Sequence, residues 1–231
     1  MKIHGLQKLT LIDYPGKVAA TLFFAGCGFR CPFCHNASLV TQIDPAAGRP
    51  AQEVLDFLAA RKGLLDGVCI SGGEPLLQPE IEPFIKEIKA MGYSVKLDTN
   101  GQQFSQLVRL ADQGLIDYVA MDIKNALPKY GKTIGLPGFD TQMVEKSAQW
   151  LLDGPLPYEF RTTVVRELHE EQDFHQIGRW LRGAKRYYLQ SFIDSGDTIA
   201  KGLSAYTKEE LEHLRQVLAE YIPCAALREV E

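Results

Sequence analysis

Residues 18–36 read VAATLFFAGCGFRCPFCHN, an apolar run that leads directly into a segment containing three cysteines. The β-branched and aromatic content of the run is typical of a buried strand. The cysteines that follow are spaced C-x-x-x-C-x-x-C and are Cys27, Cys31 and Cys34. The first long strand of the fold is therefore expected to end at a site built on thiols.

This run is the first of six short strand-like runs that alternate with helical patterns. The strand-like runs lie at 18–25, 67–71, 93–99, 117–124, 158–165 and 186–193. The segments with helical spacing lie at 51–62, 79–91, 103–113, 140–152, 170–182 and 206–221. Such alternation predicts an α/β fold whose parallel strands are joined by right-handed crossovers. Six units predict a partial (β/α)6 barrel rather than the full eight-fold barrel.

Composition restricts the function classes. The chain has 231 residues, of which 45% are hydrophobic, enough for one core and one domain over residues 1–231. A net charge of -4 with scattered basic residues argues against nucleic acid as the main ligand. No apolar stretch approaches the roughly 20 residues needed to span a bilayer. Five cysteines grouped mainly at one spot fit a reducing compartment, so we expect a cytoplasmic protein without a membrane partner.

The cysteine spacing favours an iron–sulfur cluster. Three thiolates on one loop can hold a [4Fe–4S] cube and leave one of its four irons open. A zinc site that adds His35 to the same cysteines is the alternative, and it would make the protein an interaction module. The neighbouring side chains of Cys34 and His35 would have difficulty reaching one tetrahedral ion, and the second cysteine pair of a zinc ribbon is missing.

Further motifs follow the second, third and fourth predicted strands. They are Gly72, Gly73 and Glu74 in GGEP, Asp98, Thr99 and Asn100 in LDTNG, and Asp122 and Lys124 in MDIK. All lie at carboxyl ends of strands, where parallel barrels carry their active sites. An ordinary turn would also explain the glycines, and helix capping would explain the aspartates.

Two strand residues and two loops complete the predicted rim. Arg161 on the fifth strand and Gln190 near the end of the sixth are expected to face the same cavity. As alternatives, Arg161 would pair with a core carboxylate and Gln190 would satisfy backbone groups. Residues 125–139 and 194–205 are predicted to form long loops over the rim.

The histidines carry little of the predicted chemistry. Only His35 touches a motif, and His4, His169, His175 and His213 are expected to be solvated surface residues because their sequence contexts are polar or helical.

With Phe33 before the last cysteine, the pattern C-x-x-x-C-x-aromatic-C resembles the signature of the radical S-adenosylmethionine (radical SAM) superfamily. The resemblance implies a [4Fe–4S] cluster held by Cys27, Cys31 and Cys34, with S-adenosylmethionine chelating the open iron. Electron transfer from the cluster then yields methionine and a 5′-deoxyadenosyl radical. The cofactor supplies this chemistry, so no separate acid or base is expected in the protein.

The motifs GGEP, LDTNG and MDIK resemble those of the activating enzymes of glycyl radical enzymes. This likeness places Gly72, Gly73, Glu74, Asp98, Thr99, Asn100, Asp122 and Lys124 around S-adenosylmethionine, with Phe33 and His35 beside it. In that subfamily the Cys-His-Asn backbone lies against the adenine. By the same likeness, Asp98, Thr99 and Asp122 are expected to hold a monovalent cation.

The likeness extends over nearly the whole chain, beginning at LTLIDYPGK (9–17). It is strongest to the long form of the anaerobic ribonucleoside-triphosphate reductase activating proteins. It implies a glycyl radical enzyme as partner and a flavodoxin or ferredoxin type electron donor. An activase of the pyruvate formate-lyase type, or a radical enzyme acting on a small molecule, remains as an alternative.

Overall fold

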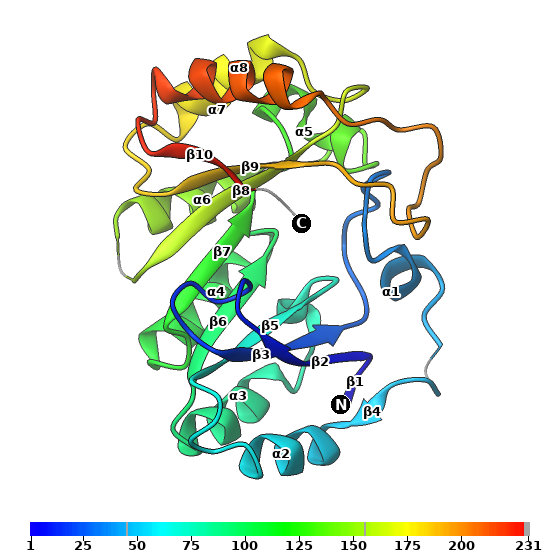
Figure 1. Ribbon diagram of the computed structural model, residues 1–231, viewed down its shortest axis with the longest axis vertical. Helices are drawn as coiled ribbons and strands as arrows, with labels where there is room; N and C mark the ends of the chain where they lie inside the picture. Colours follow the sequence, from blue (N-terminus) through cyan, green and yellow to red (C-terminus); the bar gives the residue numbers. More distant parts are fainter. Residues whose placement is uncertain (45, 155, 229–231) are drawn as a thin grey trace. The chain divides into compact units, whose positions relative to one another are not determined.

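The computed structural model describes residues 1–44, 46–154 and 156–228 (Figure 1). All six predicted strands are present, within two residues of their expected ends. They are β3 (Ala19–Phe24), β5 (Gly67–Gly72), β6 (Ser94–Thr99), β7 (Tyr118–Asp122), β8 (Tyr158–Val164) and β9 (Tyr187–Ser191).

The six predicted helices are present as well, and each is shorter than expected. They are α2 (Ala51–Ala59), α3 (Ile81–Ala90), α4 (Phe104–Asp112), α6 (Gln142–Leu152), α7 (Glu171–Trp180) and α8 (Lys208–Ala219). Each buries one side; in α3, for example, Ile81, Ile85 and Ile88 have no exposed surface. That spacing is the helical period read from the sequence.

Several short elements were not predicted. They are β1 (Lys2–Ile3), β2 (Gly5–Thr10), β4 (Arg49–Pro50), β10 (Ala225–Arg228), α1 (Ala37–Thr41), α5 (Leu127–Thr133) and a 3₁₀ turn at Pro75–Leu77. The prediction that 125–139 is a loop is therefore wrong over α5. This helix has only seven residues and contains a proline and a glycine, so its sequence carries no helical pattern. Residues 194–205 form no helix or strand, as predicted.

The chain divides into two compact units. The first comprises Met1–Gly28, Ser38–Thr99 and Gln103–Val119. Its strands follow the order β6-β5-β3-β2, with β3, β5 and β6 parallel and β2 antiparallel to β3. Phe24 pairs with Gly72, so β3 and β5 end at the same level. Two sequence-distant motifs, the cysteine segment and GGEP, therefore start side by side.

The second unit comprises Phe29–Ala37, Asn100–Gln102 and the described residues from Ala120 onward. Its strands follow the order β10-β9-β8-β7, and β8 and β10 both pair with β9 in parallel. Helices α7 and α8 contact each other, and α8 also contacts β10 (Figure 1).

Strand β7 begins in the first unit and ends in the second. The series of described strands has two free ends, β10 and β2, and so does not close into a ring. This confirms an α/β fold with an open, mainly parallel sheet, as expected of a partial barrel. A single domain over residues 1–231 stays a prediction.

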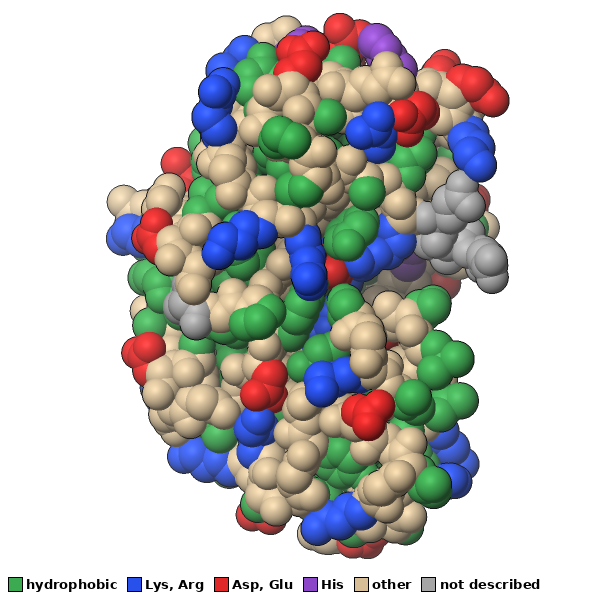
Figure 2. All heavy atoms as spheres, turned by 60° about the vertical axis from the view of Figure 1, so that its left-hand side comes forward, with side chains coloured by type: hydrophobic (Ala, Val, Ile, Leu, Met, Phe, Trp, Pro, Cys, Tyr) green, Lys and Arg blue, Asp and Glu red, His purple; other side chains and the backbone are tan. Residues whose placement is uncertain are grey.

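Charged side chains of both signs are spread over the one face of the molecule that Figure 2 draws. On the face drawn in Figure 2, Lys and Arg side chains occur among acidic and neutral ones over the whole view. Among the described residues, no helix has both the length and the apolar character needed to cross a membrane.

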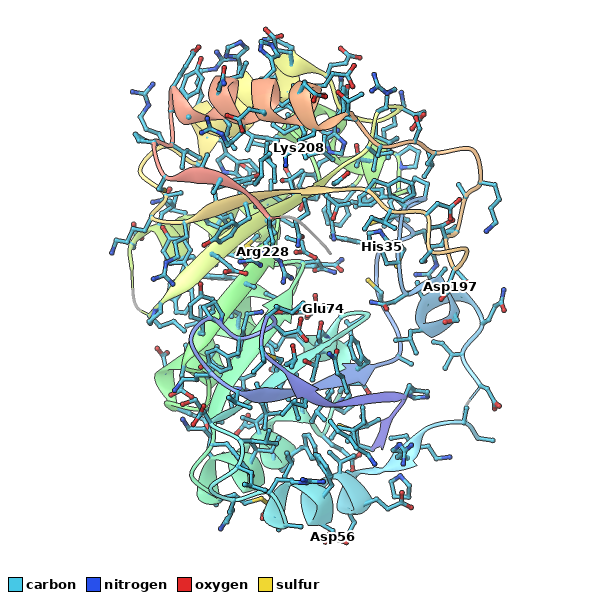
Figure 3. The ribbon with its side chains drawn as sticks, viewed as in Figure 1. His35, Asp56, Glu74, Asp197, Lys208 and Arg228 are labelled. Carbon is cyan, nitrogen blue, oxygen red and sulfur yellow. The ribbon has the colours of Figure 1, made fainter. Side chains whose placement is uncertain are left out.

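A buried ion pair ties the last described strand to β8. Glu159 has no exposed surface, and both of its oxygens accept hydrogen bonds from the guanidinium of Arg228, at 2.7 and 2.8 Å. Arg228, labelled in Figure 3, also lies 4.0 Å from the ring centre of Tyr188. Strand β10 is thereby held by a charge pair as well as by its backbone.

We expect Arg228→Ala to lower the free energy of unfolding by about 3 kcal/mol, because it removes the guanidinium that donates to both oxygens of a buried carboxylate. Urea unfolding followed by tryptophan fluorescence measures this. Arg166→Ala is the matched control, since the pair Arg166–Glu210 is exposed and contributes much less. Equal losses in the two variants would contradict this role of Glu159.

Candidate active site

The segment that leads to Cys27 is fixed by backbone hydrogen bonds in the first unit. The N–H of Gly26 donates to the carbonyl of Leu39 at 2.8 Å, and Gln78 Nε2 donates to the carbonyl of Ala25 at 2.8 Å. The N–H of Glu74 donates to the carbonyl of Gly26 at 2.7 Å. The entry to the cysteine loop therefore rests on the GGEP turn.

Glycine is required where the GGEP turn meets this segment. A Cβ at Gly73 would lie 2.1 Å from the carbonyl oxygen of Gly26. Gly72 has φ +115°, and a Cβ there would lie 2.4 Å from backbone atoms of Phe24. Both distances exclude any side chain. The two glycines thus allow the turn and the cysteine segment to touch, which an ordinary turn would not need.

Glu74, Asp98 and Thr99 lie together at the ends of β5 and β6. Thr99 Oγ1 donates to the carboxylate of Glu74 at 3.0 Å, and Glu74 has no exposed surface (Figure 3). Asp98 accepts a hydrogen bond from Ser71 Oγ at 2.9 Å and forms an ion pair with Lys96. The first unit therefore brings together three of the predicted site residues. It also adds Ser71 and Lys96, which were not predicted.

The part of the cysteine loop that belongs to the second unit is held by segments 125–139 and 194–205. The N–H of Arg30 donates to the carbonyl of Ile134, just after α5, and the N–H of Ala200 donates to the carbonyl of Pro32, each at 2.9 Å. Within the loop, the N–H of Cys34 donates to the carbonyl of Cys31 at 3.0 Å. This turn brings the last two cysteines of the motif close in space.

Lys124 lies beside this loop. Its Nζ is 5.9 Å from the ring centre of Phe33, and its positive charge acts on both neighbouring thiols. Burial raises the pKa of the Cys34 thiol, while a backbone hydrogen bond and Lys124 act in the opposite direction. A nearby cation suits thiols that become thiolates on binding metal.

Asp122, Lys124 and Arg161 form one ionic group. Arg161 Nε donates to Asp122 Oδ1 at 2.9 Å, and Lys124 Nζ donates to Oδ2 at 3.0 Å. Burial alone would raise the pKa of Asp122, but the two cations hold it well below its usual range. Burial likewise opposes the charge of Lys124, and Asp122 holds its pKa above the usual value. The carboxylate that Arg161 meets lies at the end of β7 and is one-third exposed, so it is not a core carboxylate.

His35 and Gln190 line one pocket. Its volume is about 280 Å³, and its other lining residues are Thr163, Ser191, Ile193 and Ser195. The His35 ring stacks on Phe192 with 5.7 Å between ring centres. Burial lowers the pKa of His35, which favours the neutral ring. Asn100 instead shapes its own turn, where its Oδ1 accepts from the N–H of Gln102.

The prediction of a solvated His169 is wrong. The residue has no exposed surface and packs between Phe33 and Phe174. The N–H of Val165 donates to its Nδ1 at 3.1 Å, which leaves Nε2 to donate to the carbonyl of Lys124 at 2.9 Å. His169 therefore supports both the cysteine loop and the backbone of Lys124. A single histidine after a strand carries no pattern that would reveal this position.

The other histidines differ from one another. The side chain of His213 is 59% exposed, as predicted, and that of His175 is 24% exposed. His4 is only half-buried, yet both of its ring nitrogens are buried.

Lys96, which pairs with Asp98, was not predicted as part of the site. The signal was available, because a lysine within the apolar run of β6, two positions before Asp98, lies on the same face of the strand as that aspartate.

Cys27 belongs to the first unit, and Cys31 and Cys34 belong to the second. Among the described residues, no three His, Cys, Asp or Glu side chains stand together as a metal-binding group. The cluster ligands and the other cofactor contacts therefore remain predictions from the sequence.

The sequence profile of the Radical SAM superfamily matches residues 21–181. The chain belongs to this superfamily, and it is an enzyme of the radical SAM type. Enzymes of this superfamily use a [4Fe–4S] cluster and S-adenosylmethionine. The position of Lys124 beside the thiols of Cys31 and Cys34 suits such a cluster. A zinc-binding interaction module is not supported.

Two relatives narrow the relationship. A protein of Methanocaldococcus jannaschii, provisionally named a glycyl-radical enzyme activating enzyme, is 31% identical over 99% of this chain and 96% of its own length. The pyruvate formate-lyase-activating enzyme of Clostridium pasteurianum is 35% identical over 60% of each chain.

Solved structures agree on the fold. A radical SAM methyltransferase from Sphaerobacter thermophilus has a TM-score of 0.73 at 16% identity, over 96% of this chain and 68% of its own. Streptococcus suis SuiB bound to S-adenosylmethionine has a TM-score of 0.69 at 17% identity, over 91% of this chain. The chain spans about half the length of SuiB (52%).

Replacing Cys27, Cys31 or Cys34 by serine is expected to abolish cluster binding, because each removes one thiolate ligand. Iron and sulfide analysis after anaerobic reconstitution, with the absorbance of the cluster, measures this. Cys69→Ala and Cys224→Ser are the controls, and both should keep the cluster. Loss of the cluster in folded Cys69→Ala would overturn the ligand assignment.

Folding stability is expected to fall below the ordinary histidine pKa, near 6.5. Burial lowers the pKa of His169, so below this pH the unfolded chain takes up a proton that the folded chain excludes. Stability is then complete above about pH 6.5 and decreases as the pH falls toward the lowered folded value. Urea unfolding at about pH 7.5, 6.5 and 5.5 measures the slope. His169→Gln should flatten it, whereas His213→Gln should not; equal slopes in all three proteins would contradict the assignment.

Proposed function

We propose that this protein is an activase of a glycyl radical enzyme. The observation that carries the proposal is the near full-length relationship to a relative with that name, at 31% identity over 99% of the chain. Relatives named pyruvate formate-lyase-activating enzymes, at 28 to 35% identity, support the same reaction type. When bound, the cluster and S-adenosylmethionine supply a 5′-deoxyadenosyl radical, which takes a hydrogen atom from a glycine of the partner.

The residues of the chain bind and orient in this proposal. Cys27, Cys31 and Cys34 hold the cluster. Asp122 holds both Lys124 and Arg161, and these cations are the groups proposed to receive the carboxylate of S-adenosylmethionine. The 280 Å³ pocket beside His35 and Gln190 offers a stacked ring and an amide to a planar polar group such as adenine.

For the partner we propose the anaerobic ribonucleoside-triphosphate reductase, on the strength of the resemblance that begins at residues 9–17. A pyruvate formate-lyase type partner is the second candidate, and the names of several relatives favour it. We expect a flavodoxin or ferredoxin type protein to supply the electron.

The activase is expected to produce 5′-deoxyadenosine together with a glycyl radical on its partner. The reconstituted protein, a reductant and S-adenosylmethionine are mixed with each candidate partner in turn. Electron paramagnetic resonance should show the doublet of a glycyl radical, and a partner whose reactive glycine is replaced by alanine is the control.

The outcomes separate the alternatives. A radical on a pyruvate formate-lyase type partner alone would keep the activase and replace the named partner. Turnover of a small molecule with no radical on either protein would overturn the activase.

A further inference from the structure

Lys96 is a lysine with almost no exposed surface, 1%, in the middle of β6. Its Cα pairs with that of Cys69 on β5, which in turn pairs with Thr21 on β3. Burial raises the pKa of the Cys69 thiol to about 12, so the neighbour on this side is neutral. A buried ammonium is costly unless an anion accompanies it, and the anion here is Asp98.

Both oxygens of Asp98 are engaged by protein donors. Oδ1 accepts from Lys96 Nζ, and Oδ2 accepts from Ser71 Oγ at 2.9 Å. The hydroxyl of Thr99 directs its proton at Glu74. Asp98 and Thr99 are two of the three residues expected to hold a monovalent cation, and in this structure their polar atoms serve other partners.

The third residue of that expected cation site is equally occupied. Asp122 receives Arg161 on Oδ1 and Lys124 on Oδ2. Each aspartate therefore already has a cation provided by the chain. An ammonium carries the same single charge as a potassium or sodium ion and can donate to three oxygens.

We propose that Lys96 takes the place of the monovalent cation, so that S-adenosylmethionine binding by this protein needs no added potassium or sodium ion. Lys96 is then a positioning residue that sets the charge and orientation of Asp98. The proposal rests on the cofactor binding within the proposed function and not on the identity of the partner enzyme.

The test measures S-adenosylmethionine binding by calorimetry on the anaerobically reconstituted protein. Buffers contain tetramethylammonium alone, or potassium or sodium ions at the same ionic strength. The wild-type dissociation constant should agree within about twofold across the three buffers, because no binding is linked to the metal ion. A tenfold loss of affinity in tetramethylammonium would overturn the proposal without the need for any variant.

Lys96→Ala removes the built-in charge and leaves space for an ion. In tetramethylammonium it should bind S-adenosylmethionine about tenfold more weakly, and potassium or sodium ions should restore most of the affinity. Its melting temperature before reconstitution should rise with potassium, whereas that of the wild type should not. Lys89→Ala, which breaks a pair with Asp117 elsewhere in the same unit, is the control and should respond like the wild type.

Wild-type affinity of Lys96→Ala in tetramethylammonium, or a loss that no ion restores, would overturn the proposal. If Lys96 only stabilised the fold, Lys96→Ala would lose affinity and no ion would restore it. Binding is measured without a partner, so cation-independent binding combined with failure to activate any partner counts against the activase alone.

Discussion

A carboxylate on a buried strand face needs a cation or several hydrogen-bond donors, because burial removes most of its hydration. This constraint organises the ends of the strands. Glu159 is matched by Arg228, Asp98 by Lys96, and Asp122 by two cations at once. Glu74 instead receives hydrogen bonds from Thr99 and from the N–H of Leu76. The pairings of Asp98, Asp122 and Glu74 fix side chains on which cofactor binding is proposed to depend.

The long elements could be predicted from the sequence because each repeats one pattern over many residues. Six apolar runs became strands and six segments of helical period became helices. Elements that depend on tertiary contacts could not be found in this way. Helix α5 has seven residues and is stabilised by Phe29, which packs against its Tyr130, and β10 is held by the pair of Arg228 with Glu159. Neither contact has a local signal.

The candidate site was predictable where chemistry follows residue type and spacing. The cysteines, the paired glycines and the acidic residues at strand ends were all identified, and the close approach at Gly73 gives a physical reason for one of the motifs. Contacts between residues that are far apart in the sequence were not predicted. His169 lies 45 residues beyond the backbone carbonyl that it contacts, and only the fold brings the two together. Lys96 could have been predicted, because side chains alternate along a strand and residues two apart, such as Lys96 and Asp98, share one face.

The cysteine loop is anchored by parts of the chain that are synthesised at very different times. Leu39 holds its entry, Ile134 its beginning and Ala200 its middle. Since a polypeptide emerges from the ribosome in order, the loop reaches its final conformation only after about residue 200 has been made. A truncated product that ends before the last of these anchors would lack the hydrogen bond that holds the middle of the loop, and its loop would be held only at the entry and the beginning.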